Sequence, residues 1–233
     1  MAQSSALTNS PADFFASARF NMVESQLRPN GITDARIIDA SQRLPREEFA
    51  DPTQKNFAYS DEDVSAGFGR KLMAPMVFAK LVQEAAISAS DRVLDIAPAT
   101  GYSCAILNEL AGEVVALESD PAIIRALQKN KERFLLENVG VVQGNLADGH
   151  APASPYQVIL IEGGVQWLPD TLLAQLAEGG RLLCVAMPAK SLPDQMGRAR
   201  VYTKTSGRIV MRDLFDASAP VLPAFAERQR FEF

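Results

Sequence analysis

The sequence predicts an α/β fold built on a mostly parallel sheet of seven strands, with a C-terminal antiparallel hairpin and a helical N-terminal extension. Two observations predict it. From Arg92 onward, short apolar strands alternate with amphipathic helices, which is the pattern of right-handed β-α-β units. Near the end of the chain, two strand-like segments at 199–205 and 209–215 flank Ser206-Gly207, a pair typical of a hairpin turn.

The N-terminal part has a different pattern. Helical spacing predicts helices at 12–26 and 33–43, and Thr33 or Asp34 is placed to cap the second one. The segment 45–66 is polar, contains prolines and shows little periodicity, so we expect irregular structure there. We therefore predict a helical extension with an active-site loop over residues 1–90. It should lie over the carboxyl ends of the strands and pack as one compact unit with an α/β core over 91–233.

The core elements follow from apolar spacing and from glycine and proline positions. A helix starting at Asp120-Pro121 has a good capping residue and a proline where the first turn tolerates it. A glycine pair at 179–180 ends a later helix and leads into a buried strand. Strands are expected at 92–96, 114–118, 139–143, 158–162 and 181–186, and helices at 102–111, 121–136 and 168–176.

Composition disfavours several function classes. The chain has 233 residues, a net charge of −5 and 47% hydrophobic residues, and its basic residues are scattered, so a nucleic-acid partner is not expected. No apolar run approaches the roughly 18 residues that span a bilayer, and residues 1–5 do not resemble a leader. We expect a cytoplasmic protein with no membrane partner and no metal site, with Cys104 and Cys184 as buried free thiols. The oligomeric state stays open.

The most informative segment is 93–102, where a strand runs through a tight turn into a helix. Such a turn directs backbone N–H groups and a helix N-terminus at a ligand, as in Rossmann-like nucleotide sites. About twenty residues later the next strand ends at Glu118, where a carboxylate that binds a ribose is expected. Of the usual glycine-rich turn only Gly101 is present, because Ala97, Pro98 and Ala99 fill the positions of close approach.

Several segments together resemble the protein-L-isoaspartate O-methyltransferase family. The resemblance runs from about Met22 to the hairpin. It is carried by 22–27, 31–34, 44–49, 58–61, 67–69, Pro75, the strand-turn-helix at 93–102, Glu118 and 176–181. It implies a class I, Rossmann-like methyltransferase fold with S-adenosylmethionine as cofactor. It also implies methyl transfer to a carboxylate of a damaged protein or a related substrate.

The departures from the family pattern fall near the expected chemistry. In the loop 67–75, Met73 stands where the family has its active-site serine, and Arg70 and Lys71 are cations that the family pattern lacks. These three are the candidate catalytic residues. The resemblance and the turn together give the candidate cofactor-binding residues, which are Asp95, Ala97, Ala99, Gly101, Tyr102, Glu118, Asn145, Leu146 and Glu162.

Two hypotheses follow. In the first, the chain is a methyltransferase of this family. A carboxylate acceptor is ionised at neutral pH and needs no strong base, but Met73 cannot donate a hydrogen bond to position it, so we expect isoaspartyl peptides to be methylated poorly or not at all. In the second, the chain is a non-catalytic interaction protein that kept the fold. We also expect the turn at Ala97-Pro98-Ala99 to have shifted inward rather than adopt a strained backbone, leaving a partly blocked cleft beside Glu118.

Overall fold

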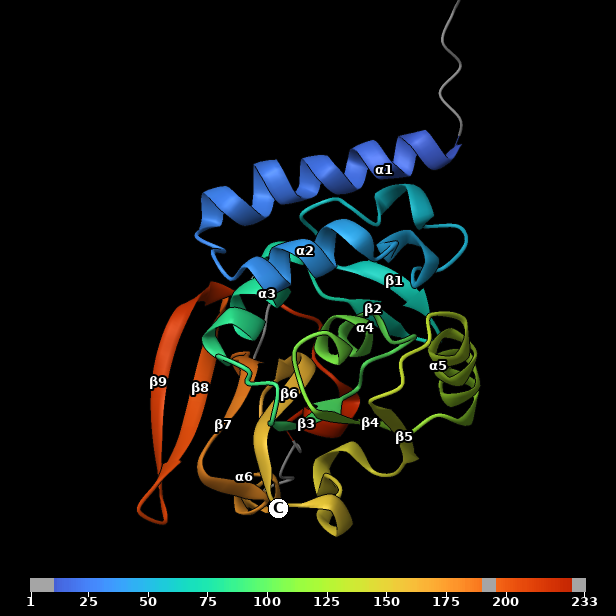
Figure 1. The fold of residues 1–233 in the computed structure, drawn as a ribbon. Coiled ribbons are helices and arrows are strands. Elements are labelled where there is room, and N and C mark those ends of the chain that lie inside the picture. The colour runs from blue at the N-terminus through green and yellow to red at the C-terminus, as the bar shows by residue number, and fades with distance from the viewer. Residues whose placement is uncertain (1–10, 190–195, 228–233) are drawn as a thin grey trace, which may run out of the picture.

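The computed structural model describes residues 11–189 and 196–227. The segment 1–5, from which the absence of a leader was predicted, lies outside this part of the chain. Figure 1 shows a central sheet with α1 and α2 crossing above the end at which β1 and β2 lie, and with the β8–β9 hairpin at the opposite edge from α5. The helices are α1 (Pro11–Met22), α2 (Ala35–Arg43), α3 (Pro75–Glu84), α4 (Tyr102–Asn108), α5 (Pro121–Arg133) and α6 (Asp170–Ala174).

The central sheet has seven strands in the order β5-β4-β3-β6-β7-β8-β9. These are β3 (Arg92–Ile96), β4 (Glu113–Glu118), β5 (Val139–Gln143), β6 (Tyr156–Val165), β7 (Leu176–Ala186), β8 (Gly197–Thr205) and β9 (Arg208–Ala217). The strands from β3 to β7 pair in parallel, while β8 and β9 pair antiparallel at the edge. The predicted fold class is confirmed, including the hairpin closed by Ser206-Gly207.

The N-terminal extension contains elements that sequence periodicity did not predict. The first helix ends at Met22 and continues as a wider turn at Val23–Leu27. Within the segment expected to be irregular, β1 (Val64–Gly67) begins a small antiparallel pair with β2 (Arg70–Leu72). The helix α3 was missed because most of its side chains are apolar and buried, which hides the one-sided spacing that indicates a helix.

Local chemistry explains the elements that were predicted. Asp34 caps α2 by accepting a hydrogen bond from the Arg36 backbone N–H, and Asp120 caps α5 in the same way through Ala122. The helix expected at 168–176 is a single short helix, α6, because β7 already begins at Leu176. Core strands are buried on both faces, as parallel sheets covered by helices require.

Apolar side chains pack on both faces of the sheet. Val93 on β3 belongs to a cluster that also holds residues of α3, α4 and the extension, whereas Leu94 and Ile96 belong to a second cluster on the other face. The extension therefore shares a core with the sheet. The division at residue 90 stays a prediction. Among the described helices none is long and apolar enough to cross a membrane.

Candidate active site

The candidate site lies at the carboxyl ends of β3, β4 and β6. The strand order reverses beside β3, because β4 and β5 continue to one side while β6 and β7 continue to the other. In open α/β sheets the crevice at this point, outside the carboxyl ends of the strands, is where ligands bind. The extension covers it, since the Thr100 hydroxyl after β3 donates to the backbone carbonyl of Phe49 at 2.5 Å.

The turn after β3 keeps a glycine-like backbone without the glycines. Ala97 and Ala99 have φ of 63° and 53°, and Gly101 has φ of 98°. The expectation that this turn shifts inward to avoid strain is therefore wrong, because both alanines adopt the left-handed conformation that costs an L-residue about 1–2 kcal/mol. Only at Gly101 does space also matter, because a Cβ there would lie 2.4 Å from the Leu127 side chain.

Glu118, the candidate ribose ligand, is completely buried at the end of β4 and is bound by Arg70 from β2. Arg70 Nε and Nη2 each donate to a different carboxylate oxygen at 3.1 Å, so the ion pair has two points of contact. The backbone N–H groups of Ala99 and Ser119 also donate to this carboxylate, each at 3.1 Å. The Arg70 side chain, and not the turn, therefore occupies the space beside Glu118 where an empty or partly blocked cleft was expected.

Asp95, near the end of β3, has one oxygen without a partner. Its Oδ2 accepts from the Ser103 hydroxyl at 2.7 Å and from the Cys104 thiol at 3.3 Å. Its Oδ1 is buried and has no hydrogen-bond partner among the described residues. Burial raises the pKa of Asp95 to about 7, against the opposing effect of the hydrogen bonds from Ser103 and Cys104. An unpaired buried oxygen of this kind is suited to accept from a ligand that supplies a donor.

Glu162 on β6 has the same property. Its side chain is buried, and Oε1 has no hydrogen-bond partner among the described residues. Burial raises the pKa of this carboxyl well above its usual range, Asp95 adds to the increase, and Arg46 opposes it. Glu162 lines the crevice at which the strand order reverses, and Asp95 lies behind Ser103, which lines the same crevice.

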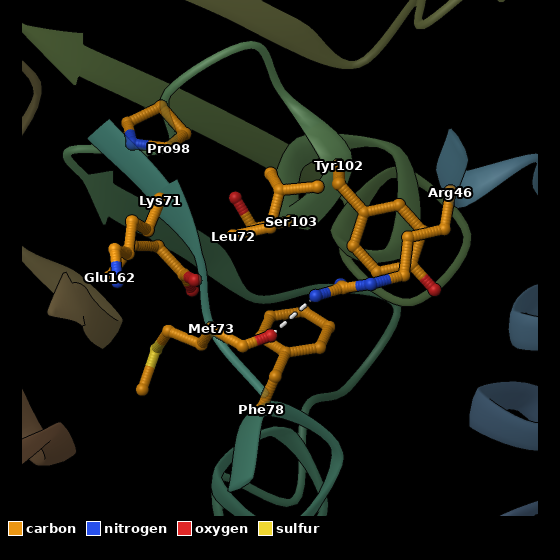
Figure 2. Close-up of a pocket in the computed structure, with 9 residues that line it drawn as sticks. All are labelled: Arg46, Lys71, Leu72, Met73, Phe78, Pro98, Tyr102, Ser103 and Glu162. Carbon is orange, nitrogen blue, oxygen red and sulfur yellow. Dashed lines mark hydrogen bonds between the residues drawn. The ribbon is translucent and has the colours of Figure 1, made fainter. Parts of the chain in front are cut away.

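Arg46 is the site residue that sequence reasoning missed. Its side chain is buried, with Nε donating to the Ala58 carbonyl at 2.7 Å and Nη2 donating to the Met73 carbonyl at 2.5 Å. Its guanidinium lies over the Tyr102 ring, 4.7 Å from the centroid. The close-up in Figure 2 shows it entering the pocket from the side opposite Glu162. The only signal was its place in the segment 44–49, which contributes to the family resemblance.

The other predicted residues have mixed positions. Met73 and Lys71 line the pocket in Figure 2, where Met73 is buried and Lys71 is exposed. Tyr102 also lines it, packed edge-on against Phe49. Asn145 instead caps the short turn that follows β5, and Leu146 is buried in the apolar cluster on one face of the sheet. The structure thus places Glu162 in the crevice, Glu118 behind Arg70 and Asp95 behind Ser103, and it uses Asn145 and Leu146 locally.

The described residues enclose two small cavities in this crevice. One has a volume of about 10 Å³ and lies between Arg46, Ser103 and Glu162. The other has about 80 Å³ and lies between Arg70, Glu162 and the segment 220–223. Pockets for ligands of cofactor size occupy about 300–1,000 Å³, so neither cavity holds a nucleotide-like cofactor as it stands, and Arg70 lines the larger one.

The residues at this crevice fit S-adenosylmethionine chemically. A buried carboxylate at the end of β4 can accept both hydroxyls of a ribose, and the unpartnered Asp95 oxygen can accept from an ammonium group. The turn 97–101 leads directly into the N-terminus of α4. The obstacle is the Arg70 guanidinium, which occupies the hydrogen-bonding positions of Glu118.

Comparisons with known proteins agree with this architecture. Residues 18–218 match the family model of protein-L-isoaspartate(D-aspartate) O-methyltransferase. Protein-L-isoaspartate O-methyltransferase of Koribacter versatilis is 32% identical over 202 residues, which cover 87% of this chain and 89% of the relative. That of Protochlamydia amoebophila is 36% identical over 72% of this chain and 80% of the relative.

Solved structures show the same similarity. One protein-L-isoaspartate O-methyltransferase superposes with a TM-score of 0.75 at 25% identity, covering 89% of this chain and 67% of that chain. A putative one from Plasmodium falciparum, in complex with S-adenosyl-L-homocysteine, has a TM-score of 0.73 at 20% identity and covers 90% of this chain and 98% of its own. The latter supports the fold alone. The family match spans most of the sequence, and this chain belongs to the protein-L-isoaspartate(D-aspartate) O-methyltransferase family.

Proposed function

We propose that this protein transfers a methyl group from S-adenosylmethionine to a carboxylate of a damaged protein, such as an isoaspartyl residue, or to a closely related acceptor. Family membership makes the chain a methyltransferase with S-adenosylmethionine as its cofactor. In this chain the proposal rests on the position of Glu118. Its carboxylate is completely buried at the end of β4, beside the point where the strand order reverses.

The proposed roles follow from the contacts at the crevice. Glu118 would accept the ribose hydroxyls once Arg70 releases it, and Asp95 Oδ1 would accept from the amino group of the cofactor. When bound, the cofactor supplies an electrophilic methyl group. An acceptor carboxylate is ionised at neutral pH, so the protein must place it in line with that methyl group and need not remove a proton.

Arg70 and Lys71 supply positive charge beside the cavity of about 80 Å³, which favours an anionic acceptor. Met73 contributes shape and no hydrogen-bond donor. We also propose that the reaction takes place in the cytoplasm on protein or peptide substrates, because both cysteines are free and buried, as in proteins of a reducing compartment. The family match does not favour the alternative of a non-catalytic interaction protein.

Two measurements test the proposal. Calorimetry with S-adenosylhomocysteine should show binding at one site. Incubation with a radiolabelled methyl donor and an isoaspartyl peptide should give slow base-labile methylation, below the roughly 1 s⁻¹ that marks the low end of typical enzymes. The matched peptide with a normal aspartyl linkage is the control and should not be labelled. Binding without any methylation of either peptide would instead favour the interaction protein.

A further inference from the structure

Glu162 is a buried acid that the proposed reaction does not yet use. It lies on β6 and contributes to the walls of both cavities in the crevice. Its side chain is 8% exposed, and its Oε1 has no partner among the described residues. Figure 2 shows the carboxyl group turned into the pocket, beside Met73. A buried polar atom without a partner is costly, so it indicates a position where a ligand completes the hydrogen bonding.

Two cations and three other side chains surround the cavities. Arg70 is bound to Glu118 until the cofactor displaces it, and Lys71, which lines both cavities, is exposed, so these two cations attract an anionic acceptor. The Thr100 hydroxyl donates to the Phe49 carbonyl, and the Ser103 hydroxyl donates to Asp95. Met73 has only a thioether, which cannot donate. Among the described residues that line both cavities, Glu162 is the buried group with an oxygen that has no hydrogen-bond partner.

The surroundings of Glu162 favour its uncharged form. Arg46 faces it, but the guanidinium of Arg46 donates to two backbone carbonyls. Removing a carboxylate from water without a hydrogen-bonded cation disfavours ionisation, and burial accordingly raises the pKa of Glu162 well above its usual range. The other titratable groups that line the two cavities are Arg46, Asp63, Arg70, Lys71 and Tyr102. The buried pair Asp95 and Cys104 lies beside them. The segment 220–223, which closes the larger cavity, contributes no charge.

We propose that Glu162, as an uncharged carboxylic acid, donates its O–H to the acceptor carboxylate seated in the larger cavity and so orients it for methyl transfer. The proton stays on Glu162 throughout, and no bond to it is made or broken. An uncharged acid attracts the anionic acceptor, whereas an ionised one would repel it. Acids kept neutral by apolar surroundings act as hydrogen-bond donors in other enzymes. This inference rests on the proposed methylation of a carboxylate.

Two substitutions separate a donor from a base. Glu162→Gln keeps an N–H donor in a side chain of the same shape, so methylation of the isoaspartyl peptide should stay within about threefold of wild type. Glu162→Ala removes the donor and should lower kcat/KM by about 10²-fold, the usual effect of losing one positioned donor. Adding Met73→Ser to Glu162→Ala places a hydroxyl in the same cavity and should restore part of the rate. Glu178→Gln, at the start of β7, is the matched surface control.

The pH dependence gives a second readout. The wild-type rate should fall as pH rises through the pKa of Glu162, because the ionised acid no longer donates. Glu162→Gln should lack this alkaline decline, since an amide does not titrate there. Inactivity of Glu162→Gln, or an unchanged decline in it, would overturn the inference.

Infrared spectroscopy tests the protonation and hydrogen bonding of Glu162 without measuring turnover. The wild-type minus Glu162→Gln difference spectrum at pH 7 should contain the C=O band of a protonated carboxylic acid. Isoaspartyl peptide, added in the presence of S-adenosylhomocysteine, should shift that band to lower frequency. A spectrum with a carboxylate band only, or an acid band that the peptide leaves in place, refutes the donor role. A shifted band without any methylation refutes the proposed function and leaves the donor role standing.

Discussion

The Arg70 guanidinium holds the Glu118 carboxylate through two parallel hydrogen bonds of 3.1 Å, although the two residues are 48 positions apart in the chain. Glu118 is completely buried, and only 11% of the Arg70 side chain is exposed. The carboxylate expected to bind a ribose is therefore already paired inside the protein. When the cofactor binds, its ribose hydroxyls must replace the Arg70 guanidinium at Glu118. The position of β2, which carries Arg70, is therefore coupled to occupancy of the site.

Replacing Arg70 should strengthen cofactor binding. In Arg70→Met the competing ion pair is gone, and ribose hydroxyls instead satisfy the buried carboxylate. Since hydrogen bonds to charged groups contribute about 1.5–3 kcal/mol, affinity for S-adenosylhomocysteine should rise by roughly tenfold or more in calorimetry. Arg200→Met on the distant β8 serves as the control. Weaker binding by Arg70→Met would show that Arg70 itself contacts the cofactor.

Removing Glu118 should weaken cofactor binding. Glu118→Ala deletes the acceptor for the ribose hydroxyls, so the dissociation constant for S-adenosylhomocysteine should rise by about 1.5–3 kcal/mol in free energy. Glu113→Ala lies on the same strand, but its side chain is 48% exposed at the opposite end, and it should bind like wild type. Equal affinities for the two variants would exclude Glu118 as the ribose ligand.

Restoring glycines in the turn should relieve backbone strain and so cost the fold less stability than a glycine in regular backbone. Ala97 and Ala99 have φ of 63° and 53°, which an L-residue adopts at a cost of about 1–2 kcal/mol each, while glycine loses about 0.5–1 kcal/mol more entropy on folding. Both methyl groups are buried, and losing each costs about 0.8 kcal/mol, so the double change Ala97→Gly with Ala99→Gly should leave the free energy of unfolding about unchanged and should tighten S-adenosylhomocysteine binding.

The control for this prediction lies in the adjacent helix. Ala105→Gly in α4 introduces the same loss of methyl group where the backbone is helical, so it should destabilise the protein by about 1 kcal/mol or more. Both variants are compared in chemical unfolding at constant pH. If the turn variant loses stability as the helix variant does, the alanines are not strained.

Asp95 should make stability depend on pH. Its folded-state pKa is raised to about 7 by burial, whereas a free aspartate titrates near ~3.9. Between these values the folded state binds more protons than the unfolded state, so the contribution of Asp95 to stability falls as pH rises through this window. The free energy of unfolding of Asp95→Asn should increase relative to that of wild type between pH 4 and 7, and above pH 7 the difference should stay constant.

Glu162 has the same sign of shift, so Asp95→Asn should leave a residual decline in stability with pH. The exposed Asp216→Asn on β9 is the control and should keep a constant difference from wild type. A constant difference for Asp95→Asn as well would show that this carboxyl ionises normally in the folded protein. The measurement is denaturant unfolding at a series of pH values.

The sequence by itself determined the elements whose signals are local. Alternating apolar strands and amphipathic helices fixed the β-α-β core, and Ser206-Gly207 fixed the hairpin, because each depends on residues a few positions apart. The position of Glu118 at the end of β4 followed in the same way, since it depends only on where one strand stops. The helix α3 escaped because burial on most sides removes the periodicity that marks a surface helix.

Only the tertiary structure determined which residues of the site contact one another. No local pattern places Arg70 on Glu118 or puts Arg46 between Tyr102 and the Met73 carbonyl. Nor does one leave an oxygen of Asp95 and an oxygen of Glu162 without a partner in the part of the chain that the structure describes. These relationships join residues from the extension, β3, β4 and β6, which meet only when the sheet is formed and covered. The turn after β3 shows the same division. Its sequence predicts a loop that shifts inward to avoid strain, whereas in the folded protein the backbone of Ala97 and Ala99 stays strained and Arg70 occupies the side of the cleft at Glu118.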